Sequence, residues 1–334
     1  GRNTVLVDGN PESQNIADTP QFAALNSYPR ITDAVTSDFY DSVTSELASV
    51  YQGRLERFTR RIVFVKPHYL VVFDDLKGRG APARFDWLLH LPNRQGVETK
   101  DGFALYRGKQ AALAVRAFSP DHSRMEVRAG RVPYPEFATR TPAQVPAQPA
   151  FLDLSSGPVD AARFLVALVP TKTGEAARAL AESMTEIKES VWVGIRTNRE
   201  KETDLIMFRT AGSGNDGRYG EWLTDAAAWT VTESSERLRV LSAHSVRSVS
   251  RSGRVLFNSD KPASFAVRFD ANAVVATVSV TQPTQIRLAT GGAPTKVRLD
   301  GRELPTTAVR YSSAKQMTQA TIPAGQHEVV FALR

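Results

Sequence analysis

Apolar and polar residues alternate with a period of two along most of the chain, which is the pattern of β-strands. In the run from Leu55 to Val65, both faces become apolar toward the end, with Val63 on one face and Ile62 and Phe64 on the other. Similar runs, each bounded by Gly, Pro, Asp or Asn, cover residues 69–76, 85–91, 111–118, 125–128, 162–169, 191–196 and 205–210. Many strands at near-regular spacing, without alternating helices, predict an all-β fold with a large antiparallel β-sandwich.

Three segments interrupt this pattern. Residues 133–149 contain five prolines, which cannot donate ladder hydrogen bonds, so we predict an extended surface loop. Residues 175–188 are rich in Ala, Glu and Leu and predict a short helix. Residues 212–217 are a Gly-rich turn and not a phosphate-binding loop, because no Lys-Ser/Thr pair follows.

The strands become shorter from about Arg254 onward, and turns such as Asp300-Gly301 separate them. We therefore predict two domains, a large sandwich (super-sandwich) over residues 1–255 and a smaller C-terminal β-sandwich over residues 256–334. No repeat of fixed period is evident, which argues against a propeller or a solenoid.

Composition narrows the classes of function. The 334 residues include no cysteine, which excludes disulfides, thiolate metal sites and cysteine nucleophiles. No apolar run approaches the ~20 residues that cross a bilayer, so we expect no membrane partner. No signal peptide is recognisable, and we expect any export signal on a part upstream of residue 1.

The formal charge of +7, with arginine far commoner than lysine, favours acidic partners. The alternative is that arginine is abundant for reasons of general composition and not of binding. We do not expect nucleic acid as a partner, because the basic residues are spread along strands and no nucleic-acid-binding motif is present.

The first residues carry the clearest motif. Arg2 to Gly9 read Arg-Asn-Thr-Val-Leu-Val-Asp-Gly, a short strand that runs into an Asp-Gly turn. We expect a sequence that begins in this way to start inside a fold and not at a free N-terminus. The motif resembles the His-Asn-Thr-Val-x-Val-Asp-Gly signature of the heparinase II/III-like polysaccharide lyases. The resemblance continues through the Arg-rich strand, Pro turn and hydrophobic strand of residues 56–76 and through Phe85-Asp86-Trp87-Leu88-Leu89-His90. It covers roughly residues 1–210.

In that family the signature lies in a β-sandwich downstream of a helical toroid, and the enzymes cleave uronate-containing polysaccharides by β-elimination. The Tyr and His that do most of this work come from the toroid and are not in this sequence. The resemblance thus implies the sandwich part of such a lyase, inactive alone, that binds an anionic polysaccharide and meets an N-terminal α/α-toroid domain in the periplasm or outside the cell. The alternative is a non-catalytic carbohydrate-binding module or interdomain scaffold. A third alternative, a glycoside hydrolase sandwich, would need two carboxylates that converge in one cleft.

The family's sandwich commonly holds zinc, with one ligand at the His of the signature. Arg2 stands at that place here, and a guanidinium cannot be deprotonated to bind zinc. Either this branch has lost the site or Gly1-Arg2 is not native to the chain. The five histidines show no close metal-ligand spacing, so we expect no metal and no other cofactor.

The resemblance also suggests candidate site residues. His90 is the candidate catalytic residue, because Trp87 and His90 end a strand that the family places near the surface facing the toroid; a satisfied or exposed structural histidine is the alternative. The candidate substrate-binding residues are Arg2, Asn3, Tyr28, Arg30 and Arg57.

Each of these assignments has a structural alternative. Arg57, with Arg60 and Arg61, could instead form ion pairs with Glu56, Asp74 or Asp75. Asn3 could simply hold a neighbouring loop. Asp74 and Asp75 are adjacent in a strand and point to opposite faces, so they cannot flank one glycosidic bond. No Ser-His-Asp order, Gly-x-Ser-x-Gly or His-Glu-x-x-His run supports the corresponding hydrolases.

Overall fold

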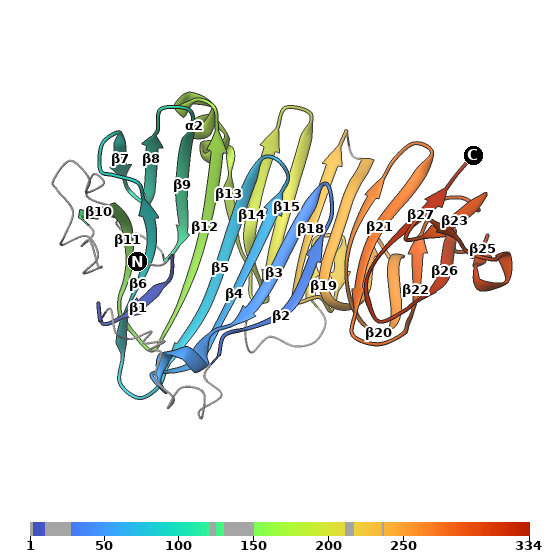
Figure 1. The fold of residues 1–334 in the computed structure, drawn as a ribbon, viewed down its shortest axis with the longest axis horizontal. Helices are drawn as coiled ribbons and strands as arrows, with labels where there is room; N and C mark the ends of the chain where they lie inside the picture. Colours follow the sequence, from blue (N-terminus) through green and yellow to red (C-terminus); the bar gives the residue numbers. More distant parts are fainter. Residues whose placement is uncertain (1–2, 11–27, 121–124, 130–149, 211–216, 236) are drawn as a thin grey trace, which may run out of the picture. The chain divides into compact units, whose positions relative to one another are not determined.

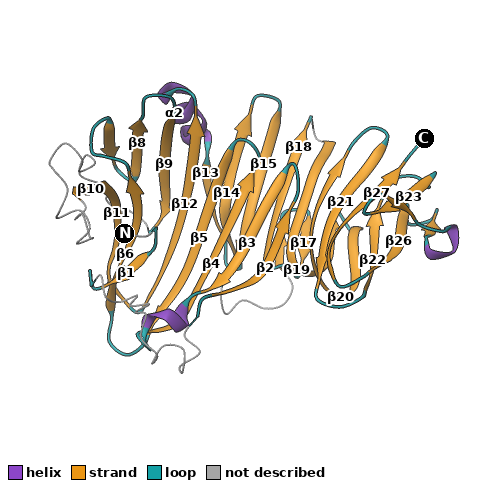
Figure 2. Ribbon diagram, in the orientation of Figure 1, coloured by secondary structure: helices purple, strands orange, loops and turns teal. Residues whose placement is uncertain are grey.

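A computed structural model describes residues 3–10, 28–120, 125–129, 150–210, 217–235 and 237–334. Antiparallel strands make up most of this part of the chain, as Figures 1 and 2 show, so the predicted all-β fold is confirmed. The predicted loop at 133–149 and nearly all of the turn at 212–217 lie outside the described residues. The chain forms two compact units, one of residues 1–32 and 44–182 and the other of residues 33–43 and 183–334.

Unit 1 contains a four-stranded sheet in the order β1-β6-β11-β10. Its strands are β1 (Val5–Val7), β6 (Ala83–Leu91), β11 (Ala150–Val159) and β10 (Met125–Ala129). A second sheet has the order β2-β3-β4-β5-β12-β9-β8-β7. Its strands are β2 (Arg30–Thr36), β3 (Tyr40–Glu46), β4 (Leu55–Val65), β5 (Tyr69–Gly78), β12 (Ala161–Thr171), β9 (Ala112–Ser119), β8 (Phe103–Arg107) and β7 (Val97–Lys100), and η2 (Ala48–Tyr51) precedes β4.

The core of unit 1 lies between these two sheets. Val5, Phe85 and Trp87 of the four-stranded sheet are buried in one cluster with Phe58 and Phe164 of the second sheet. Burial of each such large apolar side chain contributes about 1.5–3 kcal/mol to folding. The alternation that places these residues inward places the intervening residues of β6 and β11 on the opposite face, where the candidate site lies.

Helix α2 (Gly174–Ser183) forms the first part of the predicted helical segment. Thr173 Oγ1 accepts a hydrogen bond from the backbone N–H of Ala176 at 3.2 Å. The predicted end at Lys188 is wrong, because Thr185–Lys188 forms β13 and pairs with β14 (Trp192–Arg199). Thr185 and Ile187 are β-branched residues, which fit a strand better than the last turn of a helix.

Unit 2 is built on the sheet path β13-β14-β15-β18-β19-β20-β21-β27-β23-β24, to which β16, β17, β22, β25 and β26 are attached. The strands of the path after β14 are β15 (Glu202–Arg209), β18 (Ala228–Ser234), β19 (Arg237–Arg251), β20 (Arg254–Phe269), β21 (Ala273–Val280), β27 (Gly325–Ala332), β23 (Lys296–Leu299) and β24 (Arg302–Glu303). The attached strands are β16 (Gly217–Tyr219), β17 (Trp222–Thr224), β22 (Thr284–Ala289), β25 (Arg310–Ser312) and β26 (Met317–Ile322), and η5 (Thr306–Ala308) precedes β25.

The two halves of the β19–β20 hairpin pair with different strands of this sheet. The first half of β19 pairs with β18 and with the second half of β20, while its second half pairs with β17 and with the first half of β20. The register shifts between Ala243 and Val246, and Ser245 has a φ of 49°. The rings of Phe257 and Phe265, from the two halves of β20, stack with centroids 4.0 Å apart. The hairpin therefore bends, and its two halves share one core.

This bend accounts for the change in strand length in the sequence. Residue 255, the predicted domain boundary, falls at the start of β20, just after the hairpin turn. The compact units divide the chain between residues 182 and 183, apart from segment 33–43, and the two-domain division at residue 255 stays a prediction. The short strands after residue 254 thus belong to the same sheet as β14, β15 and β18.

Candidate functional site

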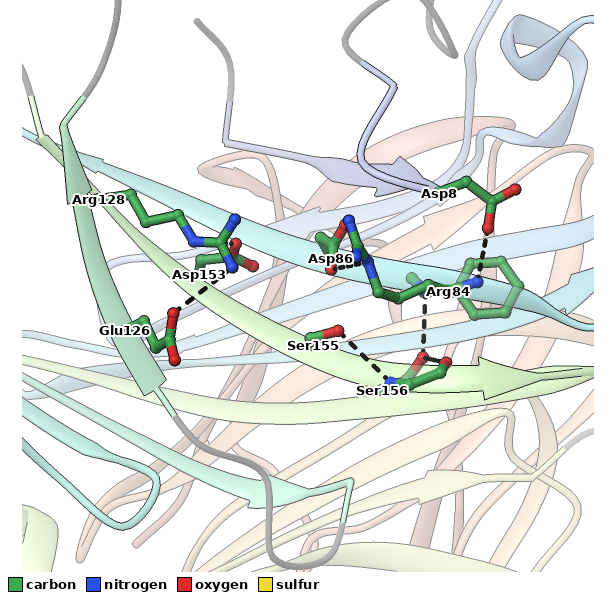
Figure 3. Close-up of polar contacts among 10 residues, drawn as sticks. Asp8, Arg84, Asp86, Glu126, Arg128, Asp153, Ser155 and Ser156 are labelled. Carbon is green, nitrogen blue, oxygen red and sulfur yellow. Dashed lines mark hydrogen bonds and ion pairs between the residues drawn. The ribbon is translucent and has the colours of Figure 1, made fainter.

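Six polar side chains share one face of the four-stranded sheet in unit 1. The register places Asp86 opposite Ser155, Leu88 opposite Asp153 and Asp153 opposite Glu126. Paired residues in an antiparallel sheet point to the same side. We call this the polar face; it comprises Arg84, Asp86 and His90 of β6, Asp153 of β11, and Glu126 and Arg128 of β10, most of which are labelled in Figure 3.

Two carboxylates lie buried in the polar face, each beneath one arginine. The side chains of Asp86 and Asp153 are both 4% exposed. Arg84 Nε lies 3.0 Å from Asp86 Oδ1, and Arg128 Nε lies 3.0 Å from Asp153 Oδ2. Burial, and next the negative charge of Asp86, raise the pKa of Asp153 to about 6, against the opposing effect of Arg128.

Asp153 can therefore change its protonation state close to neutral pH. Its Oδ1 atom is buried without a hydrogen-bond partner in the described part of the chain. A protonated carboxyl group at this place could donate a hydrogen bond or a proton. The glycoside hydrolase alternative requires two carboxylates that converge in one cleft. Asp86 and Asp153 share a face of the sheet, and each is paired with an arginine.

The Asp-Gly turn of the N-terminal motif supports the polar face. Asp8 and Gly9 have φ values of 54° and 66°, and the N–H of Asn10 donates to the carbonyl of Val7 at 3.1 Å. Two positive φ values in a tight hairpin turn favour Asp-Gly. Asp8 Oδ1 accepts a hydrogen bond from the backbone N–H of Arg84 at 2.9 Å (Figure 3), and a Cβ at Gly9 would lie 2.4 Å from Arg84 Nη2. The glycine thus leaves room for this arginine.

Asn3 and His90 are in direct contact at the other end of β6. Asn3 Oδ1 accepts a hydrogen bond from the backbone N–H of His90 at 2.8 Å and lies 3.3 Å from His90 Nδ1. A backbone N–H can only donate, so the Asn3 atom that faces it must be the oxygen. The His90 nitrogen near the same oxygen is then the protonated one, and Nε2 keeps its lone pair.

The environment of His90 favours the neutral imidazole. Burial lowers its pKa from the ordinary value. The ring lies beside Phe151 of β11, with centroids 5.8 Å apart. A neutral imidazole with a free Nε2 can accept a proton at neutral pH.

Arg60 connects this contact to the interior of unit 1. Its Nε and Nη2 atoms donate to the two oxygens of Asp74 at 2.7 and 2.6 Å, and its Nη1 donates to the carbonyl of Asn3 at 2.8 Å. Asp74 is fully buried. The bidentate ion pair fixes the Arg60 side chain, which in turn holds the backbone carbonyl of Asn3. Arg60 therefore helps to position the Asn3 side chain against His90.

Among the candidate residues that the structure describes, Asn3 and His90 are in contact with each other. Arg57 lies on β4, where its Nη2 is 2.9 Å from Asp75 Oδ1, as the ion-pair alternative expected. Tyr28 is 54% exposed and Arg30 is exposed at the start of β2. No described contact joins Tyr28, Arg30 or Arg57 to His90, and Arg2 lies outside the described residues.

Five residues of the polar face were not predicted from the sequence as site residues: Arg84, Asp86, Glu126, Arg128 and Asp153. Alternation along β6 could have placed Arg84 and Asp86 on the face of His90. The partners on β10 and β11 could not be found in the same way, because which strands become neighbours is set by tertiary pairing.

A buried polar cluster in unit 2 brings together a serine, a histidine and an aspartate that lie far apart in the sequence. Ser42 Oγ lies 2.6 Å from His244 Nε2, and Asp33 Oδ2 lies 3.2 Å from His244 Nδ1. Although burial acts in the opposite direction, the hydrogen bond and charge of His244 hold the pKa of Asp33 below its usual value. Ser42 and His244 are both buried, so a substrate carbonyl has no approach to the hydroxyl. We interpret the cluster as structural.

Within the described residues, no group of three or more His, Asp or Glu side chains is arranged to hold a metal ion. Arg2 stands at the position of the zinc-binding His in the family's signature and lies outside the described residues. The absence of zinc therefore stays a prediction. In the same part of the chain no helix is long and apolar enough to cross a bilayer.

Comparisons with known proteins place the fold. No family model matches the chain, and no curated protein sequence does. Xanthan lyase from Paenibacillus is similar in structure, with a TM-score of 0.50 at 11% identity, over 92% of this chain and 29% of that one. The chain has a polysaccharide-lyase-like fold.

Other solved lyases resemble the chain at lower TM-scores. The Streptomyces coelicolor A3 chondroitin AC lyase in complex with chondroitin sulphate gives 0.49 at 14% identity, over 91% of this chain and 36% of that one. The heparinase III-BT4657 gene product gives 0.43 at 13% identity, over 62% and 30%. The chain thus spans only about a third of the length of the lyases that it matches. At these identities the likeness is one of fold.

Proposed function

We propose that this chain is the β-sandwich region of a heparinase II/III-like lyase that cleaves a uronate-containing anionic polysaccharide by β-elimination. The observation that carries the proposal is the contact between Asn3 of the signature motif and His90, which leaves a neutral imidazole with a free Nε2. The lyase-like fold supports it.

The chemistry requires a base, a carboxylate partner and an acid. A base removes the proton from the carbon next to the uronate carboxylate, the electron pair forms a carbon–carbon double bond, and the glycosidic C–O bond breaks as its oxygen is protonated. His90 is suited to take up a proton or to hold a substrate hydroxyl at Nε2. Arg2, Tyr28 and Arg30 are candidates for binding the acidic sugar, and Arg57 could take part only while it also neutralises Asp75.

In this proposal the chain does not complete the active site. The remaining groups would come from an α/α-toroid domain in the same protein or in a partner chain, in the periplasm or outside the cell. A non-catalytic role as a carbohydrate-binding module or interdomain scaffold is the second candidate. The scaffold role is favoured by the ion pairs of Arg57, Arg60 and Arg84, because each guanidinium is already neutralised by an aspartate.

The test uses the full protein, or this chain together with a chain that supplies the toroid. It is incubated with alginate, heparan sulfate and other polyuronates, and unsaturated product is followed by its ultraviolet absorbance. His90→Ala should lower kcat/KM about 100-fold or more, the usual scale of a lost general base. His68→Ala, a histidine of the β4–β5 turn, is the matched control and should change it little.

The outcomes separate the two candidates. Turnover that depends on His90 supports the lyase. Binding of oligouronates without any product, by the complete protein, would favour the carbohydrate-binding role. Full activity in His90→Ala would show that this histidine is not part of the site.

A further inference from the structure

Unit 2 contains a cavity of about 1020 Å³ that the proposed active site does not use. It lies where the ends of several strands meet: both ends of β19, both ends of β20, the start of β21, and the loop of residues 290–295 before β23. A volume of this size is at the upper end of the range for small-molecule and cofactor sites. It can hold several sugar units.

The bend of the β19–β20 hairpin creates this cavity. Because the hairpin turns at Ala243–Val246, Arg237 at one end of β19 and Arg251 at its other end line the same space. The loop of residues 290–295 leaves the space open, since it consists of small residues with Gly291 and Gly292 at its centre. Gly291 has a φ of 73°, and a Cβ at Gly292 would meet no atom within 4 Å.

Basic side chains outnumber acidic ones in the lining of the cavity. Four arginines line it, Arg237, Arg251, Arg254 and Arg334, and Asp270 is the one acidic side chain among the described lining residues. Asp270 is already paired with Arg268, with Oδ2 at 2.9 Å from Nε. An anion that enters the cavity would therefore meet guanidinium groups and little opposing charge.

Two of these arginines have guanidinium groups that are available to bind an anion. Arg237 is exposed and pairs with Ser234 through the β18–β19 ladder, and its guanidinium forms no hydrogen bond or ion pair with another described residue. Arg254 is exposed and donates from Nη2 to Gln316 Oε1 at 2.8 Å, a neutral partner that leaves its charge uncompensated. Arg251, by contrast, is held by Glu221 and Glu233 and packs over Trp222. Arg251 thus forms part of the wall, while Arg237 and Arg254 are free to bind.

Apolar side chains form another part of the lining, beside Ser252, Thr290 and Thr295. Leu238 and Phe269 are half-buried and Leu256 and Val274 are buried at the base of the cavity. An anionic ligand with extended apolar faces fits this combination better than a free phosphate or sulfate ion does. Sugar rings that carry carboxylates have both features. A single-stranded nucleic acid would need several exposed aromatic rings for its bases, and Phe269 is the one aromatic residue among the described lining residues.

We propose that this cavity is a second glycan-binding site, which holds a segment of an anionic oligosaccharide separately from the polar face of unit 1. The identity of the ligand as a uronate rests on the proposed function, while the anionic and apolar character of the site does not. Such a site would bind the polymer without taking part in bond cleavage, and would raise the affinity of the protein for long chains above that for short ones.

The experiment measures binding to this chain by calorimetry at low salt, with an alginate tetrasaccharide as anionic probe and cellotetraose as neutral probe. The double variant Arg237→Ala/Arg254→Ala should weaken alginate binding about tenfold or more. The matched control Arg298→Ala/Arg310→Ala removes two exposed arginines of the same unit outside the cavity and should change it less than twofold. Cellotetraose should bind weakly to all forms.

A second variant tests shape independently of charge. Gly292→Leu adds a side chain where space is open and at a φ that is not left-handed, so the fold should tolerate it. It should weaken binding of the tetrasaccharide as strongly as the arginine variant does. Raising the salt concentration should weaken binding to the unaltered chain, because exposed charge interactions are screened beyond about 8 Å at 0.15 M.

Several results would overturn the inference. Equal losses in the cavity and control variants would reduce the site to general surface charge, and tight binding of a DNA oligonucleotide with no alginate binding would assign the cavity to another ligand. A complete protein that has lyase activity while its cavity binds nothing would refute this inference alone. Tetrasaccharide binding in the cavity by a protein that cleaves no polyuronate would refute the proposed function alone.

Discussion

The two units each place a histidine beside a polar side chain, and they use it in opposite ways. In unit 1, His90 is half-buried, and Asn3 occupies the Nδ1 side only. In unit 2, His244 is 2% exposed, with Ser42 at Nε2 and Asp33 at Nδ1. A buried histidine whose two ring nitrogens are both hydrogen-bonded stabilises the fold. A histidine near the surface with one nitrogen available can take part in catalysis. Accessibility separates the two roles, although the residue types alone would favour the second cluster as a catalytic triad.

The largest expected effect concerns His244. His244→Ala should lower the free energy of unfolding by about 3 kcal/mol or more, because it leaves a cavity and removes the partner of Asp33 and Ser42 in a buried site. His90→Ala should lower it by less than about 1 kcal/mol, because the ring is half-exposed. Urea unfolding of both variants measures the contrast. Equal losses would mean that the two histidines do not differ in the way described.

The next effect concerns Asp153, whose pKa is raised from an ordinary value of 3.8 to about 6. The folded state then holds this proton more tightly than the unfolded state does. Its contribution to stability is present below about pH 4 and is lost as the pH rises to about 6. Asp153→Asn mimics the protonated form. At pH 7.5 it should therefore have a free energy of unfolding, measured in urea, on the order of 1–2 kcal/mol above that of the unaltered chain after allowance for screening.

The same substitution should bring no such gain at pH 4, where Asp153 is already protonated. Asp160→Asn, at an exposed aspartate in the turn between β11 and β12, is the matched control and should change the free energy of unfolding little at either pH. A gain in Asp153→Asn that is the same at both pH values would contradict a raised pKa.

An effect of similar size concerns the Asp-Gly turn. Gly9→Ala should cost about 1–2 kcal/mol, because alanine is strained at a φ of 66° and its Cβ would meet Arg84. In an Arg84→Ala background the clash disappears and only the backbone strain remains, so the cost should be smaller. A double-mutant cycle by thermal unfolding measures the difference. Identical costs in both backgrounds would show that Gly9 does not make room for the arginine.

Much of the fold could be predicted from the sequence because period-two alternation directly reports which strands face a core. The runs at 69–76, 85–91 and 162–169 all became strands. The change of strand partners within the β19–β20 hairpin could not be predicted in this way. The strands of the β19–β20 hairpin change partners midway, near Ala243–Val246 and again around Pro262, where the missing N–H interrupts the ladder. In the sequence this looks like a change of domain.

The candidate site was predictable only in part, for a related reason. Asn3 and His90 could be named because they lie in segments that resemble a known family. Asp153 could not, because its raised pKa depends on Asp86 and on burial, and both follow from the pairing of β6 with β11. The cavity of unit 2 also depends on a bend that brings the two ends of one strand together.

The pH dependence of polyuronate cleavage by the complete protein tests the central claim most directly. If His90 acts as a neutral base, kcat/KM should fall on the acidic side with an apparent pKa below the ordinary histidine value of 6.5, because burial lowers the pKa of this imidazole. The acidic limb should move toward 6.5 in Asn3→Ala, which opens the site to water, and the remaining activity of His90→Ala should lack it. An acidic limb that is unchanged in both variants, or cleavage that does not depend on pH between 5 and 8, would contradict the account.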